Sequence, residues 1–201
     1  KRQGRTRFLM MSQHINTAEV FEAAVESDLF DLIQIPVNPT VPQDYFSKET
    51  FPNRHTREKY FEIIAKAASA GIAVVAMKTF LGGTKTWDHI EGLRDQVRDY
   101  LPDDGSIATA LIHWVLDVPG VKAFGNILFN RDQLEQNLKA ASGRLTKRED
   151  EGLRILARRL GSEMCRMCGA CTRAFPEGLA ASEMLRFRTY HLSGETESAR
   201  A

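Results

Sequence analysis

The sequence predicts an α/β fold in which four short parallel strands alternate with helices, arranged as half of a (βα)8 TIM barrel with a small helical, cysteine-containing tail. Four apolar runs are separated by segments with helical periodicity. Strands that alternate with helices pair in parallel through right-handed crossovers. A doubly wound sheet also fits this alternation, but neither G-x-G-x-x-G nor G-x-x-x-x-G-K-[ST] follows any of the runs, which favours the half barrel.

The first two βα units are expected in the first 71 residues. Residues 8–11 are a short apolar strand, and Asn16 with Glu19 forms a capping-box variant that opens a helix. Residues 32–35 predict the second strand. A loop rich in proline follows, and then a helix over residues 57–70, which Gly71 ends as a C′ residue.

The second two units follow the same order. The run Ile72–Met77 is apolar at every position, as burial on both faces of a parallel sheet requires. A Gly82-Gly83 turn, a helix over 106–116 and a fourth strand over 121–124 come next. The remaining expected helices are one capped by Asn130 and Gln133, one opened by Thr146 and Glu149 and closed by Gly161, and one over 182–191.

The amino-acid composition and net charge limit the classes of partner that we expect the protein to bind. The 201 residues are 43% hydrophobic and 26% charged with a net charge of +1, which argues against nucleic acid and anionic membranes as partners. The longest apolar run, Ile72–Met77, is too short to span a bilayer. An odd number of cysteines in a single cluster indicates a reducing compartment, so we expect a cytoplasmic protein. The chain begins at Lys1 rather than Met, so we expect a start upstream.

All three cysteines lie in one loop. Cys165, Cys168 and Cys171 have the spacing of the iron–sulfur run C-x2-C-x2-C-x3-C-P, with Phe175 at the fourth cysteine position. The spacing predicts a [4Fe–4S]-type site with one ligand missing. Two alternatives stay open, namely a zinc site with His191 as fourth ligand and small buried thiols that bind nothing.

The chain resembles the C-terminal half of an aldo/keto reductase of the bacterial subgroup with an iron–sulfur-like tail. The segments that carry the resemblance are Leu9–His14, Phe30–Gln34, Gly71–Lys78 with Gly82-Gly83, Ala110–Leu116 and Asn130–Asn137. The resemblance implies that the four strands are the fifth to eighth of the barrel, whose loops at the carboxyl ends of the strands form the active face. It divides the chain into a half barrel over residues 1–143 and a helical tail over 144–201.

The resemblance implies that six residues of this chain contact the nicotinamide cofactor. Ser12 and Gln34 match the residues that hold the nicotinamide amide, and Met77 stands where many relatives stack an aromatic ring on nicotinamide. Lys78 stands near the expected pyrophosphate. The pair Gln136 and Asn137 matches the contacts to adenine. The alternatives are a strand-end amide bonded to loop backbone for Gln34, a solvated lysine, and a solvated helix face for the Gln136–Asn137 pair.

The resemblance also has departures. The loop Gly125–Phe129 lacks the Pro-Gly pair by which relatives approach phosphate, and Ile127 and Phe129 are expected to crowd that approach. The family's catalytic Asp, Tyr, Lys and His belong to the first half of the barrel, which these residues do not match. None of the five histidines has a carboxylate or tyrosine at a spacing that indicates a catalytic pair. His113 is expected to be an ordinary, partly buried helix residue. We assign no catalytic residue.

The sequence therefore predicts an NAD(P)-dependent oxidoreductase represented by its cofactor half, inactive by itself. In the family, hydride passes from NADP to a small carbonyl substrate while a tyrosine donates the proton. Two alternatives belong to other classes of protein. One is a non-catalytic half barrel that associates with itself or with a complementary half, and the other is an iron–sulfur electron-transfer module.

Overall fold

The computed structural model describes residues 3–13, 17–39, 57–80, 84–163, 181–192 and 194–197. Four strands form one all-parallel sheet in the order β1-β2-β3-β4, which confirms the predicted α/β class. The strands are β1 (Met10–Ser12), β2 (Leu32–Pro36), β3 (Ala73–Met77) and β4 (Val121–Phe124). Strand order follows chain order, so each crossover joins two neighbouring strands.

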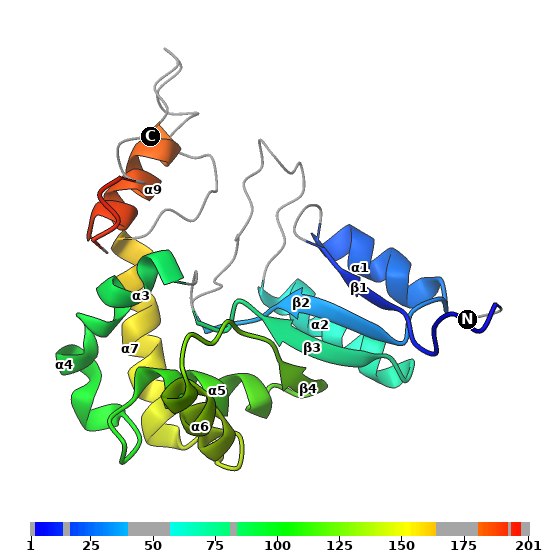
Figure 1. The fold of residues 1–201 in the computed structure, drawn as a ribbon, viewed down its shortest axis with the longest axis horizontal. Coiled ribbons are helices and arrows are strands. Elements are labelled where there is room, and N and C mark those ends of the chain that lie inside the picture. Colours follow the sequence, from blue (N-terminus) through cyan, green and yellow to red (C-terminus); the bar gives the residue numbers. More distant parts are fainter. Residues whose placement is uncertain are drawn as a thin grey trace.

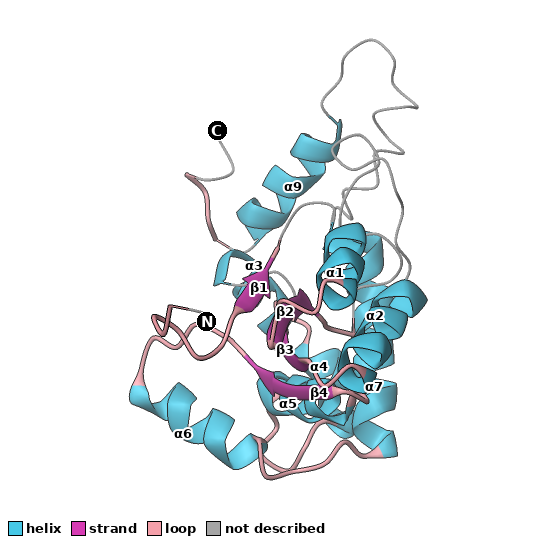
Figure 2. Cartoon of the chain, turned by 90° about the vertical axis from the view of Figure 1, so that its right-hand side faces the viewer, coloured by secondary structure: helices cyan, strands magenta, loops and turns pink. Residues whose placement is uncertain are grey.

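The crossover helices lie on one side of the sheet. They are α1 (Thr17–Glu26) between β1 and β2, α2 (Arg57–Ser69) between β2 and β3, and α5 (Ile107–Asp117) before β4. In Figure 2, α1 and α2 lie on the same side of the strands. The remaining described elements are α3 (Thr84–Glu91), α4 (Arg94–Val97), the 3-10 helix η1 (Arg98–Tyr100), α6 (Arg131–Ala140), α7 (Lys147–Glu163) and α9 (Ala181–Leu192) (Figure 1).

Side chains alternate across the sheet because successive residues of a strand point to opposite faces. The side chains that pack against the helices are fully buried, as in Ile33, Ile35, Val74 and Ala76. The opposite face is less buried. It carries two aligned rows, Met10, Leu32 and Ala73, and Ser12, Gln34, Val75 and Ala123. No described helix covers that second face in Figure 2.

Most of the local signals act as the sequence predicts. Gly71 ends α2 with a positive φ of 75°, which glycine adopts without a steric penalty. The Asn130 side chain accepts a hydrogen bond from the Gln133 amide at the predicted cap. At α5 the structure adds a cap that was not predicted, in which the Ser106 hydroxyl accepts a hydrogen bond from the Thr109 amide. At α7, the Thr146 and Glu149 side chains each bond the other's backbone amide, at 3.1 and 2.6 Å, which completes a capping box.

One part of the sequence prediction was wrong. Gly161 does not end α7, which continues to Glu163, because a single glycine weakens a helix without breaking it. In addition, the structure has α3, α4 and η1 over residues 84–100, where no element is predicted from the sequence. These elements are short, and the periodicity of so few residues is a weak signal.

Helix α7 belongs to the same core as the sheet. Leu153, Leu156 and Leu160 are each at most 2% exposed and join the main hydrophobic cluster, although the predicted boundary at residue 143 assigns them to the tail. The helix contacts α4, α5 and η1. Across the described ranges, every helix is too short or too polar to traverse a lipid bilayer.

Candidate functional site

A cavity of about 840 Å³ opens where the polypeptide leaves the carboxyl ends of β3 and β4. This volume lies within the usual range of roughly 300 to 1,000 Å³ for small-molecule sites. Its walls come from the segments after the two strands and from α3, α5 and α6. The lining residues are Lys78, Thr79, Phe80, Trp87, Asp88, Glu91, Arg94, Asp104, Gly105, Ser106, Ala108, Gly125, Asn126, Ile127, Leu128, Phe129, Gln133, Gln136 and Asn137.

Lys78 leaves β3 in an unusual conformation. Its φ is +58°, in the left-handed region that residues other than glycine seldom adopt. The buried side chain of Asn38 holds the turn, because its amide donates a 2.9 Å hydrogen bond to the Lys78 carbonyl. Burial lowers the pKa of the Lys78 ammonium below its usual 10.5. Lys78 is therefore half-buried at the cavity rather than simply solvated.

The next residue, Thr79, also lines the cavity. The residue is 1% exposed, and its buried Oγ1 atom has no hydrogen-bond partner among the residues that the structure describes. A buried hydroxyl without a partner is unusual, since most such groups are bonded to protein or ordered water. The sequence analysis missed Thr79, because only its neighbours in space show that the hydroxyl has no partner.

Gln136 and Asn137 line the cavity from α6. The Gln136 amide donates a 2.8 Å hydrogen bond to the Ser106 hydroxyl, which also caps α5. Asn137 is 9% exposed. Asn137 is thus buried, which does not fit a solvated helix face, whereas Gln136 is partly exposed. Lys78, Gln136 and Asn137, which are far apart in sequence, line one cavity.

The far wall of the cavity comes from a region that the sequence analysis left unassigned. Trp87 on α3 meets Phe80 edge-to-face, with ring centroids 5.5 Å apart. Asp88 and Glu91 follow on the same helix, and Glu91 is ion-paired with Arg94. Aromatic and charged side chains from one short helix thus face the residues after β3.

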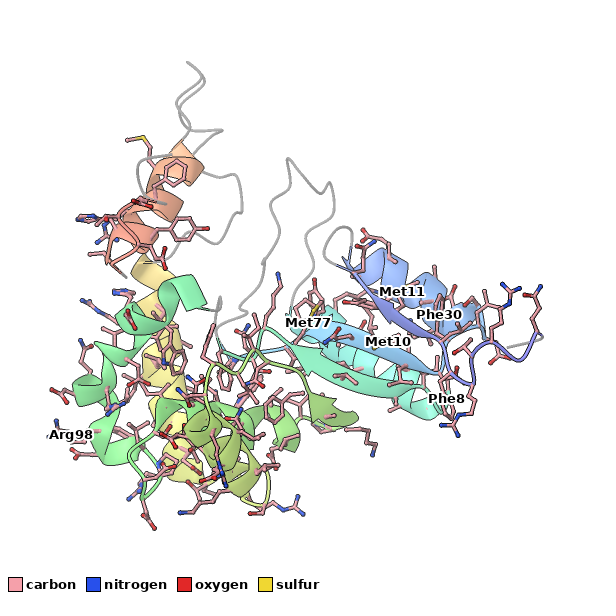
Figure 3. All side chains as sticks on the ribbon, in the orientation of Figure 1. Phe8, Met10, Met11, Phe30, Met77 and Arg98 are labelled. Atoms are coloured by element: carbon pink, nitrogen blue, oxygen red, sulfur yellow. The ribbon has the colours of Figure 1, made fainter. Side chains whose placement is uncertain are left out.

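The other three predicted cofactor residues lie together next to this cavity rather than in its lining. Ser12 pairs in register with Gln34, and the Ser12 hydroxyl lies 3.9 Å from the sulfur of Met77. Figure 3 labels Met77 at the end of the sheet. The amide nitrogen of Gln34 would lie 3.1 Å from a Cβ added to Gly125, which itself lines the cavity. Gly125 therefore connects the two groups of predicted residues.

The loop after β4 lacks a glycine-rich phosphate-binding pattern, and its large side chains both line the cavity and are exposed. Ile127 is 71% and Phe129 67% exposed. The Gly125 amide continues the sheet by donating a 2.8 Å hydrogen bond to the Ala76 carbonyl, and the Phe129 amide donates to the Gln133 side chain. Ile127 and Phe129 line the cavity despite this exposure, so the expected crowding of a phosphate by these side chains stays a prediction.

The histidine and cysteine predictions have different outcomes. His113 on α5 bonds the carboxylate of Glu149 on α7 at 2.7 Å, a partner 36 residues away that local spacing could not reveal. Cys165, Cys168, Cys171 and Phe175 lie outside the described residues. Within the described ranges, no group of three His, Cys, Asp or Glu side chains is placed to hold a metal ion. That finding does not bear on the three thiols.

Comparison with models of protein families gives no match for this chain, and comparison with curated proteins gives none either.

Proposed function

We propose that the chain is the C-terminal half of an aldo/keto reductase-like (βα)8 barrel and that it binds the NAD(P) cofactor of an oxidoreductase acting on a small carbonyl substrate. The observation that carries the proposal is the convergence of Lys78, Gln136 and Asn137 on one cavity beside the carboxyl ends of β3 and β4. Ligand sites of parallel α/β folds lie at this edge of the sheet. The sequential strand order supports a barrel, because a doubly wound sheet reverses its order.

The residues fit an extended dinucleotide. Lys78 supplies a cation for a pyrophosphate, and the unpartnered Thr79 hydroxyl supplies a donor beside it. The amides of Gln136 and Asn137 suit an adenine edge. Ser12 and Gln34, on the neighbouring open face, suit a planar carboxamide. When bound, the nicotinamide ring would supply the hydride, while these side chains would orient the dinucleotide.

Calorimetric titration of the chain with NAD⁺ and NADP⁺ tests the proposal. Lys78→Met should lower affinity by about tenfold or more, because a charge-assisted hydrogen bond is worth about 1.5–3 kcal/mol. Lys139→Met is the matched control, since Lys139 is an exposed lysine on α6 outside the cavity. Absence of binding at millimolar nucleotide, or an equal loss in both variants, would contradict the proposal.

The pH dependence gives a second readout of the same contact. Burial lowers the pKa of Lys78, so its charge is lost at a lower pH than that of a solvated lysine. Affinity for a pyrophosphate should therefore decline as pH rises toward 10.5, starting below the pH at which exposed lysines titrate. The Lys78→Met variant should not show this decline.

One observation favours a second candidate, a half barrel that associates through its sheet. The face opposite the helices carries half-exposed apolar side chains, and β1 and β4 are edge strands with no partner in the described chain. Met10 on β1 and Phe8, which precedes the strand, are 56% and 61% exposed. Open parallel edges favour pairing with another chain.

Sedimentation velocity separates this candidate from a monomeric cofactor module. Association should be concentration-dependent and should weaken in Met10→Lys, which places a charge at the open edge. Leu138→Lys is the control, because Leu138 is 65% exposed on α6, away from the edge. A monomer at micromolar concentration would eliminate the candidate.

The cysteine loop supports a third element of the proposal, an iron–sulfur-like tail. Three thiolates at two-residue intervals supply three of the four ligands that a [4Fe–4S] cluster needs. We propose that the loop descends from a complete ligand run in which Phe175 replaced the fourth cysteine.

A further inference from the structure

The cavity that we assign to the nucleotide has an excess of carboxylates. Three acidic side chains line it, and they are Asp88, Glu91 and Asp104. Two cationic side chains, Lys78 and Arg94, are the only ones that the described lining includes. Any ligand of this cavity must be compatible with that balance.

The charged groups differ in how far they are already engaged. Arg94 is ion-paired with Glu91. Both oxygens of Asp104 accept hydrogen bonds, one from the Ser106 amide at 3.0 Å and one from the Thr109 hydroxyl at 2.6 Å. In contrast, the exposed carboxylate of Asp88 has no hydrogen-bond or ion-pair partner within the described chain. Asp88 is therefore available to a ligand.

A carboxylate without a partner can distinguish a nucleotide with a free 2′-hydroxyl from one with a 2′-phosphate. A ribose with a free 2′-hydroxyl offers a donor that a carboxylate accepts, whereas a 2′-phosphate calls for an arginine in its place. A phosphate monoester carries about −1.5 to −2 charges near neutral pH, and a carboxylate beside it repels it. The two forms of the cofactor are thus distinguished by what stands next to the ribose.

We infer that the cavity takes an adenine nucleotide whose ribose 2′-hydroxyl is free, so that the chain selects NAD(H) over NADP(H), and that Asp88 is the residue that discriminates. The inference rests on the proposed function and narrows it. Lys78 after β3 and Asp88 on α3 line the same cavity, so one nucleotide can place a phosphate at the ammonium and a ribose at the carboxylate.

Calorimetric titration with two small probes tests the inference. Adenosine 5′-monophosphate and adenosine 2′,5′-bisphosphate differ only in the 2′-phosphate, and both are titrated at one ionic strength. The monophosphate should bind at least about tenfold more tightly than the bisphosphate, because like charges at the ribose oppose the latter. NAD⁺ and NADP⁺ should show the same order.

Two substitutions locate the source of the preference. Asp88→Asn keeps the size of the side chain and removes its charge, so the preference for the monophosphate should fall to about threefold or less. Asp117→Asn is the matched control, since Asp117 is exposed at the end of α5 outside the cavity lining, and it should leave the preference unchanged.

The possible results distinguish a failure of the NAD(H) preference from a failure of nucleotide binding itself. If the bisphosphate binds as tightly as the monophosphate, the inference is overturned while nucleotide binding stands. If the preference exists but is the same in Asp88→Asn as in the control, Asp88 is not the discriminating residue and the inference is likewise overturned. If none of the four nucleotides binds, the proposed function and the inference both fail.

Discussion

Replacing Thr79 by valine should stabilise the unliganded protein while weakening its affinity for nucleotide. Valine keeps the shape of threonine but removes a hydroxyl that is 1% exposed and unbonded. Leaving such a group unsatisfied costs about 1–3 kcal/mol. We therefore expect a gain of about 1–2 kcal/mol in the free energy of unfolding, or roughly 2–8 °C in Tm for a chain of this size.

The same substitution removes the donor that we assign to the ligand. The loss of a neutral hydrogen bond, about 0.5–1.5 kcal/mol, corresponds to a decrease in nucleotide affinity of roughly 2- to 12-fold. Stability is measured by urea and thermal unfolding of the unliganded chain, and affinity is measured by calorimetry with adenosine 5′-monophosphate.

Thr109 provides a matched control for this substitution. It is also buried, at 5% exposure, but its hydroxyl donates a 2.6 Å hydrogen bond to Asp104. Thr109→Val should therefore destabilise the protein by about 1–2 kcal/mol, with the opposite sign to Thr79→Val. If Thr79→Val destabilised the protein as much as Thr109→Val, or bound nucleotide as well as the wild type, our account of the Thr79 hydroxyl would be refuted.

Three further predictions test the fold and the tail. In Gly152→Ala the added Cβ would lie 2.4 Å from the Cβ of Tyr100, so α7 must shift and chemical unfolding should show a loss of about 1–2 kcal/mol; unchanged stability would exclude this close packing. The hydrogen bond from Lys59, with Lys66 adding to it, lowers the pKa of Glu22 from 4.5, so its contribution is present above that pH and lost as pH falls through the folded-state pKa. The stability advantage of the wild type over Glu22→Gln should accordingly decrease as pH falls through the acid range, and an advantage that does not change with pH would contradict the assignment. Phe175→Cys should raise iron and sulfide content after anaerobic reconstitution, whereas a lower Tm with unchanged iron would show that Phe175 is a packing residue.

The fold class could be predicted from the sequence because its signals are local. Four apolar runs gave all four strands, and the position of Gly71 as a C′ residue is confirmed by its positive φ. The predicted caps at Asn130 and Thr146 each depend on a residue three positions further along the chain. Signals of this kind are complete within one turn of helix, so no tertiary contact is needed to read them.

The candidate site could be predicted only in part, because its properties arise from contacts distant in sequence. The six cofactor positions came from the family resemblance, and three of them line one cavity. The role of α3 could not be predicted, because Trp87 and Asp88 become cavity residues only through tertiary packing of α3 near the residues that follow β3. The link between His113 and Glu149 spans 36 residues and depends on how α7 packs on α5.

Residues 78 and 79 concentrate three unfavourable features at one strand end. Lys78 has a left-handed backbone and a desolvated ammonium, and Thr79 buries an unbonded hydroxyl. An anionic ligand that accepts hydrogen bonds would make the last two favourable, because it would pair with the charge and accept from the hydroxyl. Saturating nucleotide should therefore raise the Tm of the wild type more than that of Thr79→Val or Lys78→Met. A purely structural role for the turn predicts no difference among the three proteins, so the size of the ligand-induced shift distinguishes a binding site from a strained connection.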